Sequence, residues 1–181
     1  WIEELAMITC QTEIASEIIY RKTVVKSDTL FIAISQSGET ADTLNALRQA
    51  KKLGYKNTLA ICNVPESSLV READLTFLTK AGPEIGVAST KAFTTQLTSL
   101  LMFALALGKA NGKLTKTTET TIVQHLEYLP ELISETLKLD HVISNLAEQL
   151  VEKHHILFLG RGTHYPVAME GALKLKEISY I

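Results

Sequence analysis

One short stretch of the chain gathers side chains that could bind an anion. Residues 35–40 read Ser-Gln-Ser-Gly-Glu-Thr and contain no lysine or arginine. The polar donors of this stretch are Ser35, Gln36, Ser37 and Thr40. If a helix begins here, its first backbone N–H groups have no partner within the helix, and its dipole favours negative charge. The stretch therefore predicts a site where neutral donors hold a phosphate monoester, rather than a triphosphate site built around a P-loop lysine.

A helix cap is the alternative interpretation of the same residues. Ser37 or Thr40 would then cap the helix, with Glu39 in its first turn. A single cap uses one hydroxyl group and leaves the other polar side chains of the stretch unexplained. The pattern favours anion binding, but capping stays open as an explanation.

A second polar loop precedes another predicted helix. Residues 80–90 contain two glycines and a proline, and an apolar helix is expected over residues 90–108 with Ser89 or Thr90 as its N-cap. If this helix begins beside the first one, both hydroxyl-bearing helix starts face one pocket. A mobile loop with a capping serine is the alternative.

A third group of residues could move a proton. Glu170, Lys174 and Glu177 lie at positions i, i+4 and i+7 of a helix predicted over residues 166–179, and so on one helix face. The spacing alone favours solvated ion pairs, each worth about 0.2–0.5 kcal/mol. If the group were buried, the lysine would instead keep a carboxylate ionised, ready to abstract a proton.

The elements that must position these residues alternate along the chain. Short apolar runs at 29–34, 58–62 and 74–78 predict strands, and helices are expected at 40–53 and 68–72. This alternation predicts an α/β fold with a doubly wound parallel sheet and helices on both faces. Right-handed crossovers would bring every strand-to-helix turn to one sheet edge, where such folds bind ligands.

The remaining segments extend this scheme at both ends. A helix is expected over 1–8, a short strand at 12–15 and a helix at 16–21. Helices are also expected at 117–128 and 130–152, with Pro130 at a helix start and a break near Asp140. A strand at 155–159 followed by the helix at 166–179 repeats the layout of residues 29–53, and so predicts the opening of a second, homologous half. The chain begins inside a helix and ends just after one, so it is expected to be a piece of a longer protein.

Composition excludes several classes of function. The chain has 181 residues, a formal net charge of −2 and 46% hydrophobic residues, which is typical of a soluble globular protein and gives no indication of nucleic-acid or membrane binding. Cys10 and Cys62 are too far apart to form a metal-ligand pair and are expected to be reduced structural thiols. His125 and His141 are isolated and are expected at the surface. No signal peptide or membrane-spanning segment is expected.

Several long motifs resemble one enzyme family. They are Ser-Gln-Ser-Gly-Glu-Thr-Ala-Asp-Thr from residue 35, Ile-Cys-Asn-Val from residue 61, Glu-Ile-Gly-Val-Ala-Ser-Thr-Lys-Ala-Phe-Thr-Thr-Gln from residue 84, and the segment from Leu159 to Tyr180. Together they resemble glutamine–fructose-6-phosphate aminotransferase, the bacterial type of glucosamine-6-phosphate synthase. The resemblance implies a fragment of the isomerase portion, which has two sugar isomerase (SIS) domains. It divides the chain into a first SIS domain without its first strand (1–110), a helical connector (111–153) and the start of a second SIS domain (154–181).

The resemblance also implies roles for individual residues. Ser35, Gln36, Ser37 and Thr40 match residues that hold the sugar phosphate, and Val87 and Ser89 match further substrate contacts. Glu177 matches the base that moves a proton between C1 and C2, and Lys174 and Glu170 match its neighbours on the same helix. No metal and no cofactor is implied.

The family converts fructose 6-phosphate and glutamine to glucosamine 6-phosphate and glutamate, using ammonia from an N-terminal glutaminase domain. The resemblance implies a cytoplasmic homodimer. The glutaminase domain, the first SIS strand, a ring-opening histidine and a C-terminal lysine of the family are not in this sequence, so the chain alone is expected to be inactive. Two alternatives remain: a regulatory SIS module that binds a phosphosugar without catalysis, and a structural oligomerisation domain.

Overall fold

The computed structural model describes residues 1–86 and 88–180. The chain forms two compact units, Trp1–Thr120 and Thr121–Ile181. The finer division into 1–110, 111–153 and 154–181 stays a prediction.

A parallel sheet of three strands forms the centre of the first unit. The strands are β1 (Leu30–Ser35), β2 (Asn57–Cys62) and β3 (Leu75–Leu78), in the order β1-β2-β3. Ser35 pairs with Cys62, and Cys62 pairs with Leu78, so all three strands end at the same level. The three strands predicted at 29–34, 58–62 and 74–78 and their parallel arrangement are confirmed.

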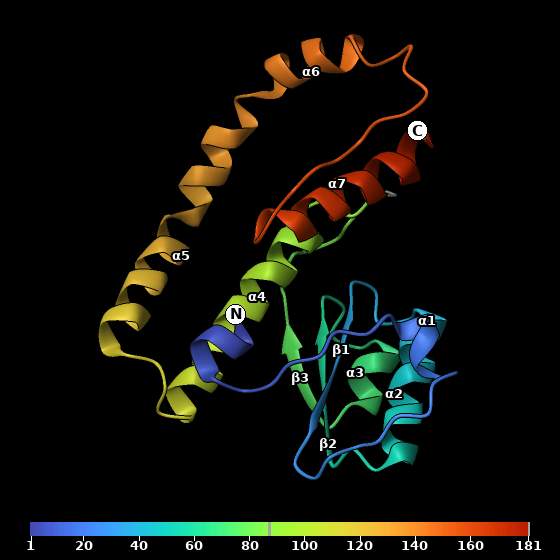
Figure 1. Cartoon of the computed structure of the whole chain (residues 1–181), viewed down its shortest axis with the longest axis vertical. Coiled ribbons are helices and arrows are strands. Elements are labelled where there is room, and N and C mark those ends of the chain that lie inside the picture. The colour runs from blue at the N-terminus through green and yellow to red at the C-terminus, as the bar shows by residue number, and fades with distance from the viewer. Residues whose placement is uncertain (87, 181) are drawn as a thin grey trace. The chain divides into compact units, whose positions relative to one another are not determined.

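Helices cover both sides of this sheet. α2 (Ala41–Leu53) connects β1 to β2, and α3 (Ser68–Glu72) connects β2 to β3. With α1 (Ala15–Ile18) they lie on one side of the sheet, while η1 (Ile2–Ala6) and α4 (Lys91–Ala110) lie on the other (Figure 1). α4 packs on η1 through Gly108, where an added Cβ would lie only 2.5 Å from the backbone oxygen of Leu5.

The core between α2 and the sheet fixes where α2 begins. Leu44 and Leu47 are buried against Ala33, Ala60 and Leu69. Burying a leucine side chain contributes about 1.5–3 kcal/mol, so these contacts hold the helix firmly to the strands. α2 ends at Gly54, whose φ of 92° lies in the left-handed region that favours glycine. The first turn of α2 is thereby held directly beyond the end of β1.

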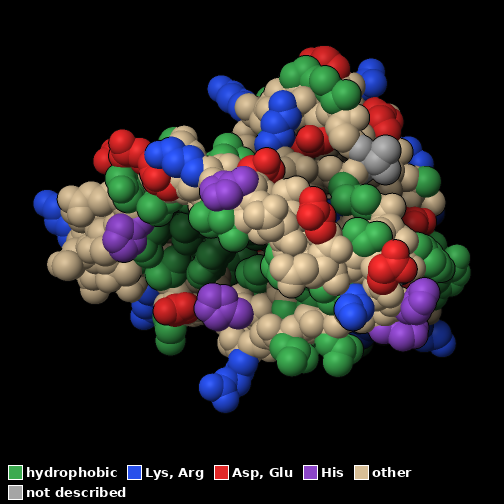
Figure 2. Space-filling model, turned by 90° about the horizontal axis from the view of Figure 1, so that it is seen from above, with side chains coloured by type: hydrophobic (Ala, Val, Ile, Leu, Met, Phe, Trp, Pro, Cys, Tyr) green, Lys and Arg blue, Asp and Glu red, His purple; other side chains and the backbone are tan. Residues whose placement is uncertain are grey.

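The second unit is helical. It contains most of α5 (Lys116–Leu137), together with α6 (Asp140–Glu148) and α7 (His164–Ser179). The predicted break near Asp140 is confirmed, but the predicted helix start at Pro130 is wrong, because α5 continues through that residue. Proline removes one hydrogen bond from a helix interior, and the turns on either side of Pro130 keep α5 intact. Hydrophobic side chains also reach the surface of the protein (Figure 2): on α6, Val142, Ile143 and Leu146 are each more than half exposed.

Two predicted strands are absent from the structure. Residues 155–159 pair with no strand among the described residues, and residues 12–14 lie outside regular structure before α1 begins at Ala15. An apolar run becomes a strand only beside a partner that takes up its backbone hydrogen bonds. The helices expected at 1–8 and 16–21 are shorter, as η1 and α1. No described helix is both long enough and apolar enough to cross a membrane.

We expect the packing of α2 on the sheet to depend on Leu47, which is 0% exposed. Replacing Leu47 with Ala should lower the free energy of unfolding by about 2–5 kcal/mol, because the lost burial leaves a cavity. Leu75→Ala is the matched control: this leucine is 56% exposed, and its truncation should cost less than about 1 kcal/mol. Urea denaturation followed by circular dichroism measures both changes, and equal losses would contradict the assignment of the core.

Candidate functional site

Three loops begin at one edge of the sheet. Gln36, Asn63 and Thr79 are the first residues after β1, β2 and β3. The backbone N–H of Asn63 donates to the oxygen of Gln36 (3.2 Å), and that of Thr79 donates to the oxygen of Cys62 (3.0 Å). The backbone pairing therefore continues one residue beyond the strands and holds the starts of the three loops together.

The turn between β1 and α2 brings its hydroxyl groups close to one another. The Ser35 hydroxyl accepts a hydrogen bond from the N–H of Gly38 (3.0 Å) and lies 3.4 Å from that of Thr40. The Ser37 hydroxyl accepts from the N–H of Glu39 (3.2 Å). Ser35 is buried, Gln36 and Ser37 are half-buried, and Thr40 is exposed. The structure therefore brings the four predicted anion-binding residues together in one turn, which a small ligand can reach through Thr40.

Gly38 allows this turn to pack tightly. Its φ is +69°, and an added Cβ would lie 2.1 Å from the Oγ of Ser67 and 2.8 Å from the Sγ of Cys62. Its carbonyl oxygen accepts a hydrogen bond from the N–H of Leu69 (3.0 Å). The loop between β2 and α3 thus lies directly against the turn and limits how far it can move.

The three helices that follow these strands differ in what caps them. At α3, the Glu39 carboxylate accepts from the N–H of Ser68 (2.7 Å), and Ser67 accepts from that of Val70. At α4, the Glu84 carboxylate accepts from the N–H groups of Thr90 (3.3 Å) and Ala92 (2.9 Å). At α2, Thr40 occupies the N-cap position but its side chain makes no capping hydrogen bond.

The way each helix is capped tests two predictions, the hydroxyl cap of α4 and the capping alternative at α2. Thr90 does occupy the N-cap position of α4, but its hydroxyl donates to the oxygen of Ala88, so the predicted hydroxyl cap is wrong and Glu84 caps that helix instead. The capping alternative for Ser37 and Thr40 also fails, because neither caps α2. The N-terminus of α2 is therefore open to an anion from outside the chain.

Residues 79–86 and 88–90 belong to the second loop of the candidate site. The Asn63 side chain donates from Nδ2 to the oxygen of Gly82 (2.7 Å) and accepts at Oδ1 from the N–H of Ala81 (2.8 Å) and the hydroxyl of Thr79 (3.2 Å). Ser89 is half-buried near the start of α4, and Val87 lies outside the described residues. The substrate contacts proposed for these two residues stay predictions.

Glu170, Lys174 and Glu177 form a charged row on α7, in the second unit. Lys174 Nζ lies 2.6 Å from a Glu177 carboxylate oxygen and 3.5 Å from one of Glu170. Its hydrogen bond to Glu177 raises the pKa of Lys174 above its ordinary value, so the amine stays charged at neutral pH. The side chains are 26–38% exposed, which fits the solvated ion pairs that the spacing favours.

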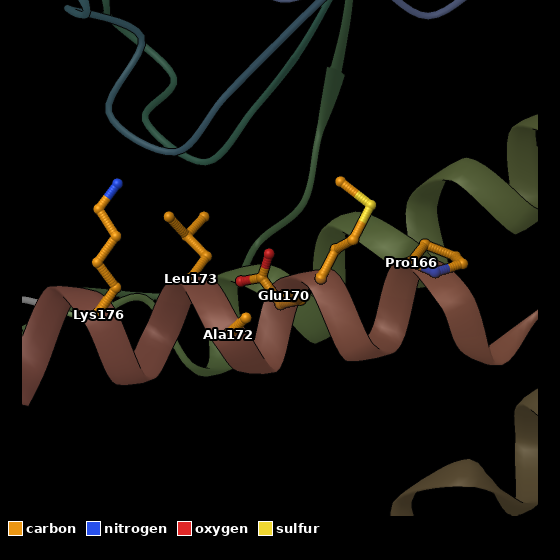
Figure 3. A pocket seen from close by; sticks show the side chains of 6 residues that line it. Pro166, Glu170, Ala172, Leu173 and Lys176 are labelled. Carbon is orange, nitrogen blue, oxygen red and sulfur yellow. The ribbon is translucent and has the colours of Figure 1, made fainter. Parts of the chain in front are cut away.

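A shallow pocket runs along the same helix (Figure 3). It is lined by Pro166, Met169, Glu170, Ala172, Leu173 and Lys176. Glu170 is the member of the charged row that reaches this apolar surface. The described residues contain no cluster of histidine, cysteine or acidic side chains that could hold a metal ion.

Sequence reasoning missed three residues that shape the site: Glu39, Asn63 and Glu84. Glu39 was expected in the first turn of α2, yet its carboxylate caps α3. Asn63 belongs to the Ile-Cys-Asn-Val motif, but nothing in that motif indicates its contacts with Thr79, Ala81 and Gly82. Glu84 lies six residues before the N-cap of α4, too far for a local capping pattern to reveal it.

Comparison with known proteins decides the family. A model of the SIS domain matches residues 1–106 and 149–181. The chain belongs to the SIS domain family. Curated relatives are glutamine–fructose-6-phosphate aminotransferases, including those of Pseudomonas putida and Pseudomonas syringae, each 64% identical over the whole chain. The resemblance inferred from the motifs is confirmed, although this SIS chain covers only 30% of each relative.

A solved structure supports the same assignment. The C-terminal domain of glucosamine-fructose-6-phosphate aminotransferase from Francisella tularensis matches all of this chain and 51% of its own, with 55% sequence identity and a TM-score of 0.97. The predicted SIS fold, a parallel sheet with flanking helices, is therefore confirmed.

We expect the Glu39–Ser68 contact to contribute to stability in a pH-dependent way. The backbone N–H and side chain of Ser68 donate to Glu39 and lower its pKa, so the folded pKa lies below the unfolded value of about 4.3. This contribution is present above the unfolded pKa and is lost as pH falls through the folded pKa. Glu39→Gln should therefore lose less stability than the starting protein between about pH 5 and 3.

Chemical denaturation across that pH range measures the effect. Some acid sensitivity will remain, because hydrogen bonds from Arg48 and Thr58 also lower the pKa values of Glu72 and Asp74. Glu66→Gln is the control, since it removes an exposed carboxylate from the neighbouring loop. Both variants change the net charge by the same amount, so a difference between them reports the loss of the Glu39–Ser68 contact. If Glu39→Gln lost as much unfolding free energy as the starting protein over this acidic range, the contact would be absent in solution.

Proposed function

We propose that this SIS chain binds the phosphate of fructose 6-phosphate at the turn between β1 and α2, with Ser35, Gln36, Ser37 and Thr40 as donors. The observation that carries the proposal is the open N-terminus of α2. At α3 and α4, by contrast, the N-terminal N–H groups donate hydrogen bonds to carboxylates of the chain itself. Backbone N–H groups and hydroxyls at a helix N-terminus form an anion site. The names of the curated relatives supply the sugar phosphate as the anion.

The neutral donor set suits a monoester. A phosphate monoester carries up to two negative charges, and the helix dipole adds the equivalent of about half a positive charge at the N-terminus. Hydroxyl and amide donors give directional hydrogen bonds without holding the product as tightly as an ion pair would. The site can therefore bind a sugar phosphate reversibly during turnover.

In the full-length protein, we expect the chain to form part of the isomerase site of a glutamine–fructose-6-phosphate aminotransferase. Fructose 6-phosphate and ammonia would give glucosamine 6-phosphate and water, after ammonia adds at C2 and a proton moves from C1 to C2. Glu177 would accept and return that proton. Lys174 would orient the Glu177 carboxylate through its 2.6 Å hydrogen bond, and Glu170 would hold Lys174 from the preceding turn.

The remaining predicted properties belong to the same proposal. Ser89 and Val87 would contact the sugar, and a glutaminase domain of the full-length protein would supply ammonia from glutamine. The full-length protein would be a cytoplasmic homodimer that needs no cofactor and no metal ion.

A regulatory SIS module is the second candidate, and the geometry of α7 favours it in one respect. Glu177 is bound to Lys174 and 38% exposed, which is also what a surface ion pair would show. Such a module would need the turn between β1 and α2 but not the charged row on α7. The two candidates therefore differ in what Glu177 does.

Phosphate binding can be tested on the chain itself. Isothermal titration should show that fructose 6-phosphate binds, and that Ser37→Ala and Thr40→Val each weaken binding by about threefold to tenfold through loss of one hydrogen bond. Thr117→Val is the matched control, because Thr117 is an exposed threonine in the first turn of another helix, α5. If the control weakened binding as much as Thr40→Val, the phosphate would not lie at α2.

Catalysis can be tested in the full-length protein. Glu177→Gln should leave the affinity for fructose 6-phosphate within about twofold and lower kcat by about 10²- to 10⁴-fold, the usual contribution of a general base. Glu148→Gln, on the exposed surface of α6, serves as the control. An unchanged kcat in Glu177→Gln would show that Glu177 is not the base, and a full-length protein that binds fructose 6-phosphate without turnover would favour the regulatory module.

A further inference from the structure

Asn63 lies between the two loops of the site and contacts both. As the first residue after the middle strand, it donates its backbone N–H to Gln36 in the turn between β1 and α2 (3.2 Å). Its side chain faces the other way and makes three hydrogen bonds, to Thr79, Ala81 and Gly82. The neighbouring Cys62 also contacts both segments, through its thiol to the oxygen of Gln36 (3.6 Å) and its backbone oxygen to the N–H of Thr79 (3.0 Å), but the Asn63 side chain extends the contact to Ala81 and Gly82.

We propose that Asn63 is a positioning residue that sets the second loop, through residues 79–82, relative to the phosphate-binding turn, so that sugar contacts depend on it. The inference rests on the proposed function, because it takes the turn as the phosphate site and the second loop as the sugar site. Asn63 itself need not touch the ligand.

The chemistry of the amide fits this task. Asparagine offers two N–H donors and an oxygen that accepts two hydrogen bonds, and three of these four positions are used by the second loop. An aspartate could accept from Ala81 and Thr79 but could not donate to the Gly82 oxygen, and it would place a negative charge near the anion site. A primary amide therefore meets both requirements at this position.

The backbone of the second loop needs such support. Lys80 has a φ of 54° and Gly82 a φ of 72°, so the two residues adopt left-handed conformations on either side of Ala81. A non-glycine residue holds such a conformation only where surrounding contacts enforce it. The amide of Asn63 supplies contacts to Ala81 and Gly82 at this point.

Mutation can separate the role of the Asn63 side chain from that of its backbone N–H. Asn63→Ala keeps the backbone N–H that holds Gln36 and removes only the side chain that holds the second loop. We therefore expect Asn63→Ala to retain affinity for inorganic phosphate within about twofold. Its affinity for fructose 6-phosphate should fall by about threefold to tenfold, the effect of losing about one net hydrogen bond from the positioned loop.

The test is calorimetric titration of the 181-residue chain with inorganic phosphate and with fructose 6-phosphate, joined to amide hydrogen exchange at Ala81. Exchange at Ala81 should be at least about tenfold faster in Asn63→Ala, because the Oδ1 acceptor is gone. Asn57→Ala is the matched control, since Asn57 is exposed at the opposite end of the same strand. Thr79→Val provides a second variant that removes one donor to Oδ1 and should shift the affinity ratio in the same direction.

The outcomes separate this inference from the proposed function. If the unmodified chain binds neither phosphate nor fructose 6-phosphate, the proposed function fails and the inference fails with it. If it binds both and Asn63→Ala and Thr79→Val leave the ratio of the two affinities unchanged, the inference alone is overturned. If Asn63 had a purely structural role, its loss would lower stability and reduce the affinities for both ligands equally. That result would also overturn the inference.

Discussion

The register of three parallel strands is the constraint on which the site depends. Because Ser35, Cys62 and Leu78 lie side by side at the ends of β1, β2 and β3, the loops that follow them start at the same edge of the sheet, in the order of the strands. A slip of one residue in this pairing would turn the side chains of a strand to the opposite face of the sheet. The packing of Leu44 and Leu47 against the sheet then fixes the direction of α2. Backbone pairing and a small apolar core thus place the uncapped amides of α2, and the core residue Leu69 also donates its N–H to Gly38 in the turn.

The distribution of carboxylates gives this edge of the sheet its selectivity. A helix N-terminus attracts any anion, including the side chains of its own protein. Glu39 occupies the start of α3 and Glu84 that of α4. Glu39 lies next to the N-cap of α2 in the sequence, yet its side chain turns to α3, because Gly38 allows the turn to pack against Ser67. The same turn therefore removes a competing carboxylate from α2 and presents hydroxyl groups there.

The sequence predicted the parts of the structure that local patterns determine. The three strands, α2 and α3 each combine an apolar period with a clear stop signal, and they lie within one or two residues of their expected positions. The candidate anion-binding turn could be predicted because its hydroxyl and amide side chains all fall within residues 35–40. The strand expected at 155–159 failed because strand formation depends on a partner elsewhere in the chain, which no local pattern reports. The helix start predicted at Pro130 was wrong for a related reason. The preference of proline for the first turn of a helix is weaker than the stability gained by continuing a long helix. Glu84 and Asn63 act through the folded positions of loops, and only the structure reveals such contacts.

The charges of the two candidate regions assign them different chemical roles. The row on α7 carries two carboxylates and one ammonium group, so it would repel a phosphate but could take up a proton. The turn at α2 has hydroxyls, an amide and a helix dipole, which attract a phosphate, and its one carboxylate, Glu39, is bound to Ser68 at the start of α3. Lys174 lies closer to Glu177 than to Glu170, so one of the two carboxylates is held in a defined orientation. Taken separately, the turn at α2 is therefore suited to holding an anionic group, and the row on α7 is suited to exchanging a proton.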